Sequence, residues 1–137
     1  MAINTEYLER CIETLKKAAN LIKNENENTV EYEMYRNAIV KGFEMTLEQS
    51  GKLLKKRLLP YFSSKKSADT LTFKDIFRHA LKHSLLSEEE VDRWFKYRDN
   101  RNNTAHDYGI AFAQETVLLI NDFIKDAEHL KDVIQND

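Results

Sequence analysis

Residues 35–60 read YRNAIVKGFEMTLEQSGKLLKKRLLP, and the spacing of their apolar side chains predicts one long α-helix. Its inward face recurs at intervals of three and four and holds Tyr35, Ile39, Phe43, Leu47, Ser50, Leu54 and Leu58. Pro60 lacks an amide hydrogen and disfavours a helical conformation at the residue before it, so we expect the helix to stop at Leu59. Asn28 followed by Glu31 predicts the other end, as an N-cap with a carboxylate three residues on.

Helical periodicity extends to both sides of this stretch. A first helix is expected from about Asn4 to Asn24, where one stripe carries Leu, Ile, Ala and Cys residues. Downstream, Thr72 with Asp75 predicts the start of a short helix. Ser87 with Glu90 is a capping box and predicts the start of another helix.

The last two connections complete the predicted architecture. The helix that opens at Ser87 is expected to run toward Thr104, and a final helix is expected to begin near Asp107. The polar stretch from Ser63 to Thr70 is expected to be a flexible loop. Five helices with short connections predict an all-α fold, an up-and-down four-helix bundle with an additional short helix.

Composition limits the class of protein. The chain has 137 residues, so we expect a single helical domain over residues 1–137, and its one cysteine, Cys11, excludes an internal disulfide. Its 21 basic and 23 acidic residues give a net charge of -2, which excludes a globally basic nucleic-acid-binding protein but allows a local basic patch. With no long apolar run and no apolar signal core at the N-terminus, we expect a cytoplasmic protein without membrane contact.

Two glycines interrupt the long helix. Gly42 and Gly51 each cost roughly 1 kcal/mol relative to alanine in a helix interior. Either the fold tolerates this cost, or a neighbouring helix approaches too closely for a side chain. The sequence leaves both explanations open.

Common catalytic motifs, such as a P-loop, a zinc-protease helix or a nucleophile elbow, are absent. Asp75, His79 and His83 lie four residues apart and share one helical face, so a metal site is conceivable. A solvated face near a helix C-terminus explains them more simply, and we predict no metal. His129, among acidic residues of the last helix, is expected at the surface.

The segment RDNRNNTAHDY, residues 98–108, interrupts the apolar pattern. Arg98 and Arg101 continue the face that Val91, Trp94 and Phe95 begin, so a face that should be buried becomes cationic. Unpaired buried charge costs several kcal/mol. The two arginines therefore meet carboxylates, or line a cleft, or line an interface between subunits. The competing interpretation is a helix end in which Asn and Asp side chains satisfy backbone groups.

Arg101, His106 and Tyr108 form the pattern R-x4-H-x-Y, which resembles the motif of the HEPN superfamily in its HepT-like form. The same proteins are often called nucleotidyltransferase substrate-binding subunits. The resemblance extends to Phe43–Glu48 and to the segments that precede the motif, and so covers most of the chain. It implies a helical domain that acts as a metal-independent endoribonuclease toxin of a toxin–antitoxin pair. The alternative is a non-catalytic subunit that presents a substrate to a nucleotidyltransferase.

The residues of the motif suit RNA cleavage by the 2′-hydroxyl without a cofactor. His106 can act as base or acid near neutral pH, and Arg101 supplies permanent charge for phosphate oxygens. Asn102 could hydrogen-bond a phosphate, and Arg98 supports the same site. On a continuous helix Arg101 and His106 lie about 140° apart, so only a break after the arginine would bring them together in one chain. Two chains facing each other would supply both a base and an acid, and we expect a two-fold homodimer.

Tyr108 has a second role by resemblance. In HepT-like pairs a minimal nucleotidyltransferase antitoxin transfers AMP to the tyrosine of this motif, and the bulky anionic adduct would exclude RNA from the cleft. The competing interpretation is a packing tyrosine at a helix start.

A basic stretch is the candidate RNA-binding surface. It contains no acidic residue between Gly51 and Ala68, and its cations are Lys52, Lys55, Lys56, Arg57, Lys65 and Lys66. Tyr61 and Phe62 are interleaved and could stack on bases. A solvated helix end is the ordinary explanation for such a stretch.

Overall fold

The computed structural model describes the backbone of residues 2–106 and 110–136, and the side chains of these except residues 103–106, 110 and 112. The described part is helical and contains no strand, which confirms the all-α prediction. Its elements are α1 (Glu6–Ile22), α2 (Val30–Leu58), the 3-10 turn η1 (Leu59–Tyr61), α3 (Lys65–Asp69), α4 (Phe73–Lys82), α5 (Glu88–His106) and α6 (Ile110–Gln135).

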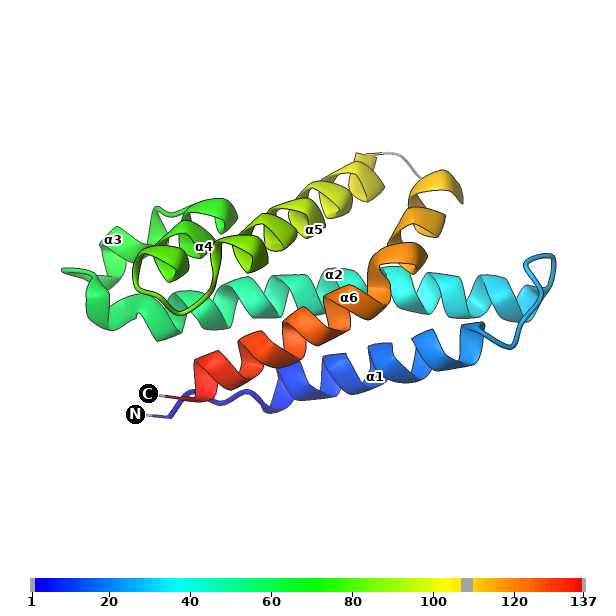
Figure 1. Cartoon of the computed structure of the whole chain (residues 1–137), viewed down its shortest axis with the longest axis horizontal. Coiled ribbons are helices and arrows are strands. Elements are labelled where there is room, and N and C mark those ends of the chain that lie inside the picture. Colours follow the sequence, from blue (N-terminus) through cyan, green and yellow to red (C-terminus); the bar gives the residue numbers. More distant parts are fainter. Residues whose placement is uncertain (1, 107–109, 137) are drawn as a thin grey trace.

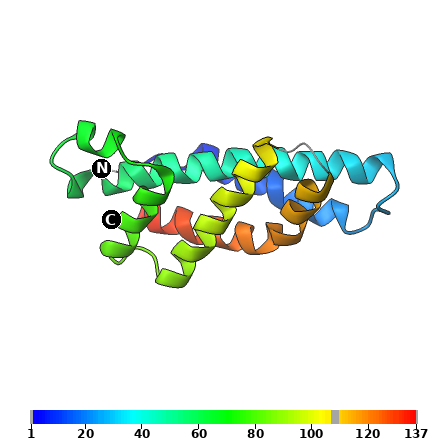
Figure 2. The ribbon, with the colours of Figure 1, turned by 90° about the horizontal axis from the view of Figure 1, so that it is seen from above.

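Three of the four long helices form one bundle and the fourth leans away from it. Helices α1, α2 and α6 lie side by side along the molecule, and α5 crosses them obliquely and diverges from α2 toward its C-terminal end (Figures 1 and 2). The short helix α4 packs between α2 and the first half of α5. Both termini and α3 lie at one end of the bundle, where α2 ends (Figure 1). No helix in the described part of the chain is long and apolar enough to cross a membrane.

Two predicted boundaries are wrong. The N-cap of α2 is Thr29 and not Asn28, because the Thr29 hydroxyl accepts a hydrogen bond of 3.1 Å from the amide of Tyr32. The expected loop from Ser63 to Thr70 contains α3, whose first turn is capped by the Ser64 hydroxyl. The described part therefore has six α-helices instead of five.

Other boundaries are confirmed. Helix α2 ends at Leu58, two residues before Pro60, and continues as a 3-10 turn. The predicted helix start at Thr72 and the predicted capping box at Ser87 are both confirmed, and the start at Thr72 is also a capping box. Thr72 and Asp75 exchange two hydrogen bonds of 3.2 Å at the start of α4. Ser87 and Glu90 exchange bonds of 3.1 and 3.2 Å before α5.

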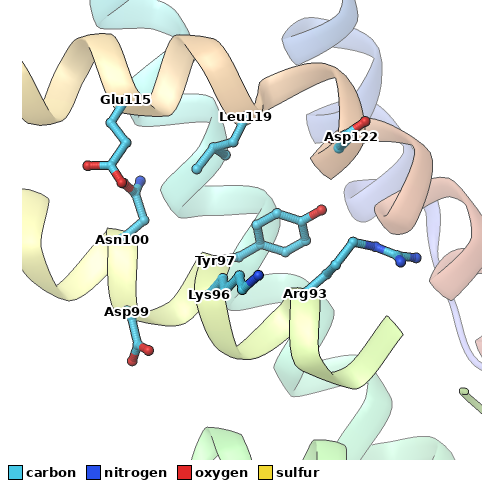
Figure 3. A pocket seen from close by; sticks show the side chains of 8 residues that line it. All are labelled: Arg93, Lys96, Tyr97, Asp99, Asn100, Glu115, Leu119 and Asp122. Carbon is cyan, nitrogen blue, oxygen red and sulfur yellow. The ribbon is translucent and has the colours of Figure 1, made fainter. Parts of the chain in front are cut away.

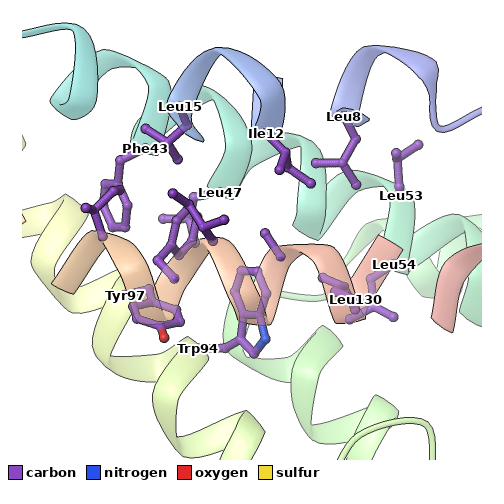
Figure 4. Close-up of a cluster of buried hydrophobic side chains, with 14 of the residues drawn as sticks. Leu8, Ile12, Leu15, Phe43, Leu47, Leu53, Leu54, Trp94, Tyr97 and Leu130 are labelled. Atoms are coloured by element: carbon purple, nitrogen blue, oxygen red, sulfur yellow. The ribbon is translucent and has the colours of Figure 1, made fainter. Parts of the chain in front are cut away.

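Aromatic rings occupy the centre of the core. Trp94 of α5 is fully buried and its ring centroid lies 4.9 Å from that of Phe77, 5.5 Å from Tyr97 and 5.6 Å from Phe123. Phe43 of α2 meets Phe123 edge to face at 4.7 Å. Leucines of α1, α2 and α6 extend this cluster along the bundle (Figure 4). The first half of α5 is therefore anchored in the core, and its second half extends from this anchored part.

Both glycines of α2 mark close approaches. A Cβ at Gly42 would lie 3.0 Å from Cδ1 of Leu15 in α1. A Cβ at Gly51 would lie 2.8 Å from two ring atoms of Phe73, the first residue of α4. Of the two explanations that the sequence left open, close approach of a neighbouring helix is confirmed at both positions.

A partly buried ion pair connects α5 to α6. The Arg93 guanidinium donates two hydrogen bonds, of 2.8 and 2.9 Å, to the carboxylate of Asp126, which is buried. The Tyr97 hydroxyl donates to the same carboxylate at 2.5 Å. The bidentate geometry fixes the rotation of α5 about its axis, because Arg93 and Tyr97 are one helical turn apart.

The Gly51 contact yields a stability prediction. Overpacking against a held ring costs about 1–3 kcal/mol, which outweighs a gain of about 1 kcal/mol from replacing helical glycine with alanine. We therefore expect Gly51→Ala to lower the free energy of unfolding in urea. Gly42→Ala is the matched control, because its Cβ would come closest, at 3.0 Å, to the end of the Leu15 side chain, which can shift more easily than a ring, and it should change stability less. A Gly51→Ala protein as stable as Gly42→Ala would contradict the assignment.

The Asp126 network yields a pH prediction. Burial, followed by the hydrogen bond to Asp126, raises the pKa of Tyr97 above its ordinary value. This contribution to stability is fully present below about pH 10, the unfolded-state pKa, and is lost as pH rises beyond it. Urea unfolding between pH 8 and 11 should show a fall in stability that is shallower in Tyr97→Phe, by up to about 1.4 kcal/mol per pH unit. Equal slopes in the wild-type and Tyr97→Phe proteins would refute the prediction.

Candidate functional site

The inner face of α5 changes from apolar to cationic along its length. Val91, Trp94, Tyr97 and Asn100 are buried, and Arg98 and Arg101, on the same side of the helix, are half-buried. The structure thus confirms that the arginines continue the buried face. Among the described residues, no carboxylate lies within ion-pair distance of either guanidinium. Of the three outcomes open to the arginines, pairing with a described carboxylate is excluded.

An aromatic ring holds Arg98 in place of a carboxylate. The Arg98 guanidinium lies 5.3 Å from the centroid of the Phe73 ring, within the range of a cation–π contact. The neighbouring carboxylate, Asp99, is 2.8 Å from the ammonium of Lys74 and already paired. Arg98 is therefore positioned by packing while its charge stays available to an anion.

Helix α5 does not break after Arg101. It continues through His106, so the helical positions of Arg101 and His106 remain about 140° apart. Instead, the position of His106 follows Arg98 and Asn102 on one stripe, at successive intervals of four residues. Asn102 is exposed on that stripe. The side chain of His106 and all of Tyr108 lie outside the described residues.

A hollow lies between α5 and α6 (Figure 3). Its volume is about 420 Å³, and it is lined by Arg93, Lys96, Tyr97, Asp99, Asn100, Glu115, Leu119 and Asp122. Two lining cations and three carboxylates leave it without a dominant charge. At its edge the Asn100 carboxamide donates a 2.9 Å hydrogen bond to the buried Thr116 hydroxyl.

The Asn100–Thr116 pair was not predicted. The sequence allowed the polar residues here to be either a site or a helix end with backbone capping. Asn100 instead bonds a side chain of the next helix, 16 residues further along the chain. A polar residue at the same inward spacing as Trp94 and Tyr97 was the available signal for such a pair.

The predicted RNA-binding cations divide into two kinds. Lys55 forms a 3.0 Å ion pair with Asp69 of α3, and Arg57 donates a 3.1 Å hydrogen bond to the carbonyl of Asn136. Lys52 and Lys56 are exposed, and no described carboxylate pairs with them. All four residues line a hollow of about 880 Å³ at the end of α2, which also includes Ile3, Pro60 and Lys65.

His79 of α4 and His83, the C-cap of α4, pack on the aromatic residues of the basic stretch. The His83 ring stacks on Tyr61 with centroids 3.9 Å apart, and His79 meets Phe62 edge to face at 4.9 Å. These contacts differ from the solvated face that was expected. Among the described residues, no group of three or more His, Cys, Asp or Glu side chains could hold a metal ion.

His129 lies at the surface of α6, as expected. Its side chain is 52% exposed, and its Nδ1 is 2.5 Å from a carboxylate oxygen of Glu90 in α5. It lies near the C-terminal end of α6, far from the start of this helix at Ile110, which follows the motif. His129 therefore belongs to no arrangement with Arg98 or Arg101.

Known proteins resemble this chain over almost its whole length. A curated relative, the probable ribonuclease HepT of Haemophilus influenzae, is 26% identical over 132 residues, which cover 93% of this chain and 89% of the relative. The relative's name supports the HepT-like resemblance seen in the motif.

Solved structures share the fold. One from Haemophilus influenzae, described as the fold of a substrate binding domain of a nucleotidyltransferase, matches with a TM-score of 0.81 at 24% identity, covering 97% of this chain and 100% of that one. A crystal structure from Thermus thermophilus matches with a TM-score of 0.74 at 23% identity, covering 94% and 99%. The family described as nucleotidyltransferase substrate binding protein like matches residues 4–136. This chain belongs to that family.

Proposed function

We propose that the protein is a metal-independent endoribonuclease, the toxin of a toxin–antitoxin pair, with Arg101 and His106 at the reacting phosphate. The observation that carries the proposal is the cationic face of α5, whose two arginines pair with no described carboxylate and which leads to the backbone position of His106. A half-buried guanidinium without a carboxylate favours an anion in its place. The printed name of the Haemophilus influenzae relative, a probable ribonuclease, supports RNA as the source of that anion.

The chemistry requires no cofactor. The 2′-oxygen of RNA attacks the adjacent phosphorus while a base takes the hydroxyl proton, and the bond to the 5′-oxygen breaks as an acid donates a proton to it. The products are a 2′,3′-cyclic phosphate and a 5′-hydroxyl. His106 supplies proton transfer at neutral pH, and Arg101 stabilises the extra negative charge on the phosphorane oxygens.

The unbroken helix assigns separate faces to these groups. Because Arg101 and His106 are about 140° apart, one copy of α5 does not direct both toward the same phosphate oxygen. Arg98 and Asn102 share the stripe of His106 and contribute charge and a hydrogen bond there. A two-fold homodimer brings a second α5 to the cleft and completes it with the other chain's histidine.

A second function has its own support. A non-catalytic subunit that presents a substrate to a nucleotidyltransferase fits the description of the Haemophilus influenzae structure. Both functions place a nucleotide phosphate at Arg98 and Arg101. Cleavage of RNA by the purified protein in the presence of a chelator separates them, because a binding subunit leaves RNA intact.

Regulation follows from the same motif. A partner minimal nucleotidyltransferase transfers AMP to Tyr108, and the adduct puts a phosphate and a nucleoside next to the RNA cleft in the cytoplasm. The adduct's negative charge and bulk then compete with the RNA backbone for the cationic face.

The nuclease assignment predicts the effect of two substitutions. Arg101→Ala should lower the rate of metal-free RNA cleavage by about 10²–10³, and His106→Ala by about 10²–10⁴. Cyclic-phosphate ends, detected by mass spectrometry of the fragments, identify the reaction. His129→Ala is the matched control, because His129 is an exposed histidine outside the cleft, and it should cleave at the wild-type rate.

Two results would count against this assignment. A His106→Ala protein that cleaves at the wild-type rate removes the histidine from the chemistry. A wild-type protein that sediments as a monomer at micromolar concentration while it cleaves RNA removes the composite cleft.

Charge reversal at Arg101 should change dimerisation or RNA binding more than charge reversal at the exposed Lys23.

The control signal predicts a different variant. Tyr108→Phe keeps the ring but removes the hydroxyl that accepts AMP, so the variant should stay folded, cleave RNA and escape neutralisation. Mass spectrometry after incubation with the partner and ATP should show the adduct on wild type and none on Tyr108→Phe. Absence of AMP from the wild-type protein would refute the modification and strengthen the binding-subunit function.

A further inference from the structure

The cationic face of α5 and the basic end of α2 meet through one residue, Phe73. We propose that single-stranded RNA bound at Arg98 and Arg101 continues past Phe73 onto the end of α2, where Lys52, Lys56 and Lys65 hold its phosphates. This deepens the proposed function and rests on it, because it extends the RNA path away from the reacting phosphate. We call Arg98, Phe73, Lys52, Lys56 and Lys65 the RNA track.

The hollow at the end of α2 has the charge that RNA requires. Its lining contains five cations and one carboxylate, and the carboxylate, Asp69, is paired with Lys55. Arg57 is occupied by the carbonyl of Asn136 at the end of α6. Lys52, Lys56 and Lys65 remain exposed without an ion pair to a described residue. These three lysines are therefore the phosphate ligands of the track.

The contact at Gly51 joins this hollow to the motif. One face of α2 carries Gly51, against which the Phe73 ring rests, and the same ring lies 5.3 Å from the Arg98 guanidinium. Lys55, which lines the hollow, is one helical turn beyond Gly51 on that face, a rise of about 6 Å at four residues. The edge of the hollow is thus close to the arginine, although α2 and α5 diverge further along (Figure 1).

An aromatic platform flanks the lysines. Tyr61 follows Pro60 of the hollow and stays 46% exposed although His83 stacks on one side of its ring. Lysines beside an exposed aromatic ring are the combination that binds single strands, since phosphates meet the cations while a base stacks on the ring. A double helix hides its bases from such a ring, so the track selects single-stranded RNA.

The test measures RNA binding and cleavage separately. Fluorescence anisotropy with a labelled uridine oligonucleotide of about 12 nucleotides, within the site size of single-strand grooves, is recorded in chelator at several salt concentrations. The binding protein carries His106→Ala so that the RNA stays intact. The test variant adds Lys52→Gln, Lys56→Gln and Lys65→Gln, and the control adds Lys17→Gln, Lys23→Gln and Lys125→Gln, three exposed lysines elsewhere.

Loss of three phosphate contacts has a calculable effect. The slope of log affinity against log salt should become shallower by about 2, and affinity should fall about 100-fold at 0.1 M salt. The control has the same net charge and should bind within a few-fold of its parent. Tyr61→Leu should weaken binding further, whereas Tyr61→Phe should not. Unfolding curves of all variants verify that they are folded.

Cleavage assays on otherwise wild-type protein complete the test. The Lys52, Lys56 and Lys65 triple variant should show a higher KM for long RNA and an unchanged kcat/KM for a dinucleotide. Equal weakening by the test and control triples would overturn the track, as would loss of binding to the nucleotidyltransferase in place of RNA. If wild type binds RNA through these lysines but does not cleave it, the track stands and the nuclease assignment fails.

Discussion

The contact between Gly51 and Phe73 connects the fold to the site. Because Gly51 has no side chain, the Phe73 ring lies directly on α2 and starts α4 there. On its other side the same ring packs 4.7 Å from Phe77 and carries the Arg98 guanidinium at 5.3 Å. A glycine that costs roughly 1 kcal/mol in helix propensity thereby sets the distance between α2 and α5 and the place of a cation. Any change in this contact shifts core packing and site geometry together.

The energetic cost of the charges on α5 explains why the contact of Arg98 with Phe73 matters. An uncompensated charge that is fully buried costs several kcal/mol, and a cation–π contact returns about 0.5–2 kcal/mol. Arg98 and Arg101 are half-buried, so their cost is smaller, but no described carboxylate removes it. By contrast Arg93, two turns earlier, has a complete bidentate partner in Asp126. One helix thus carries an arginine that is paired within the fold and two that pair with no described carboxylate, and an anion that bound those two, as we propose, would stabilise the fold.

Features with a local cause could be predicted from the sequence. The helix periodicity, the capping boxes at Thr72 and Ser87, and the end of α2 before Pro60 each depend on residues a few positions apart. The cap of α2 was misplaced by one residue, because Asn28 and Thr29 are both good caps and only the geometry selects Thr29. The Ser63–Thr70 segment was assigned to a loop because its composition is polar, yet Ser64 caps a short helix there.

Features with a distant cause could not be predicted. The Arg57 guanidinium donates a hydrogen bond to the carbonyl of Asn136, 79 residues away, and the Lys55 ammonium forms an ion pair with Asp69 of α3. The sequence of a basic stretch does not show which of its side chains are already paired with other groups of the protein. The sequence could not show whether the glycines are a tolerated cost or mark close approach of a neighbouring helix. Only the structure places Phe73 against Gly51 and Leu15 against Gly42.

The unbroken α5 gives the two arginines of the site different tasks. Polar residues after Arg101 suggested a break that would turn His106 toward it, but asparagine and threonine are only mildly unfavourable in a helix, and the helix continues. Arg98, which contacts the Phe73 ring, shares its stripe of the helix with the backbone position of His106. Arg101 lies about 60° around the helix from Arg98 and about 20° from Trp94. For the proposed nuclease, this spread of positions around α5 calls for either a strand of several phosphates or a second copy of the helix, and the two requirements are compatible.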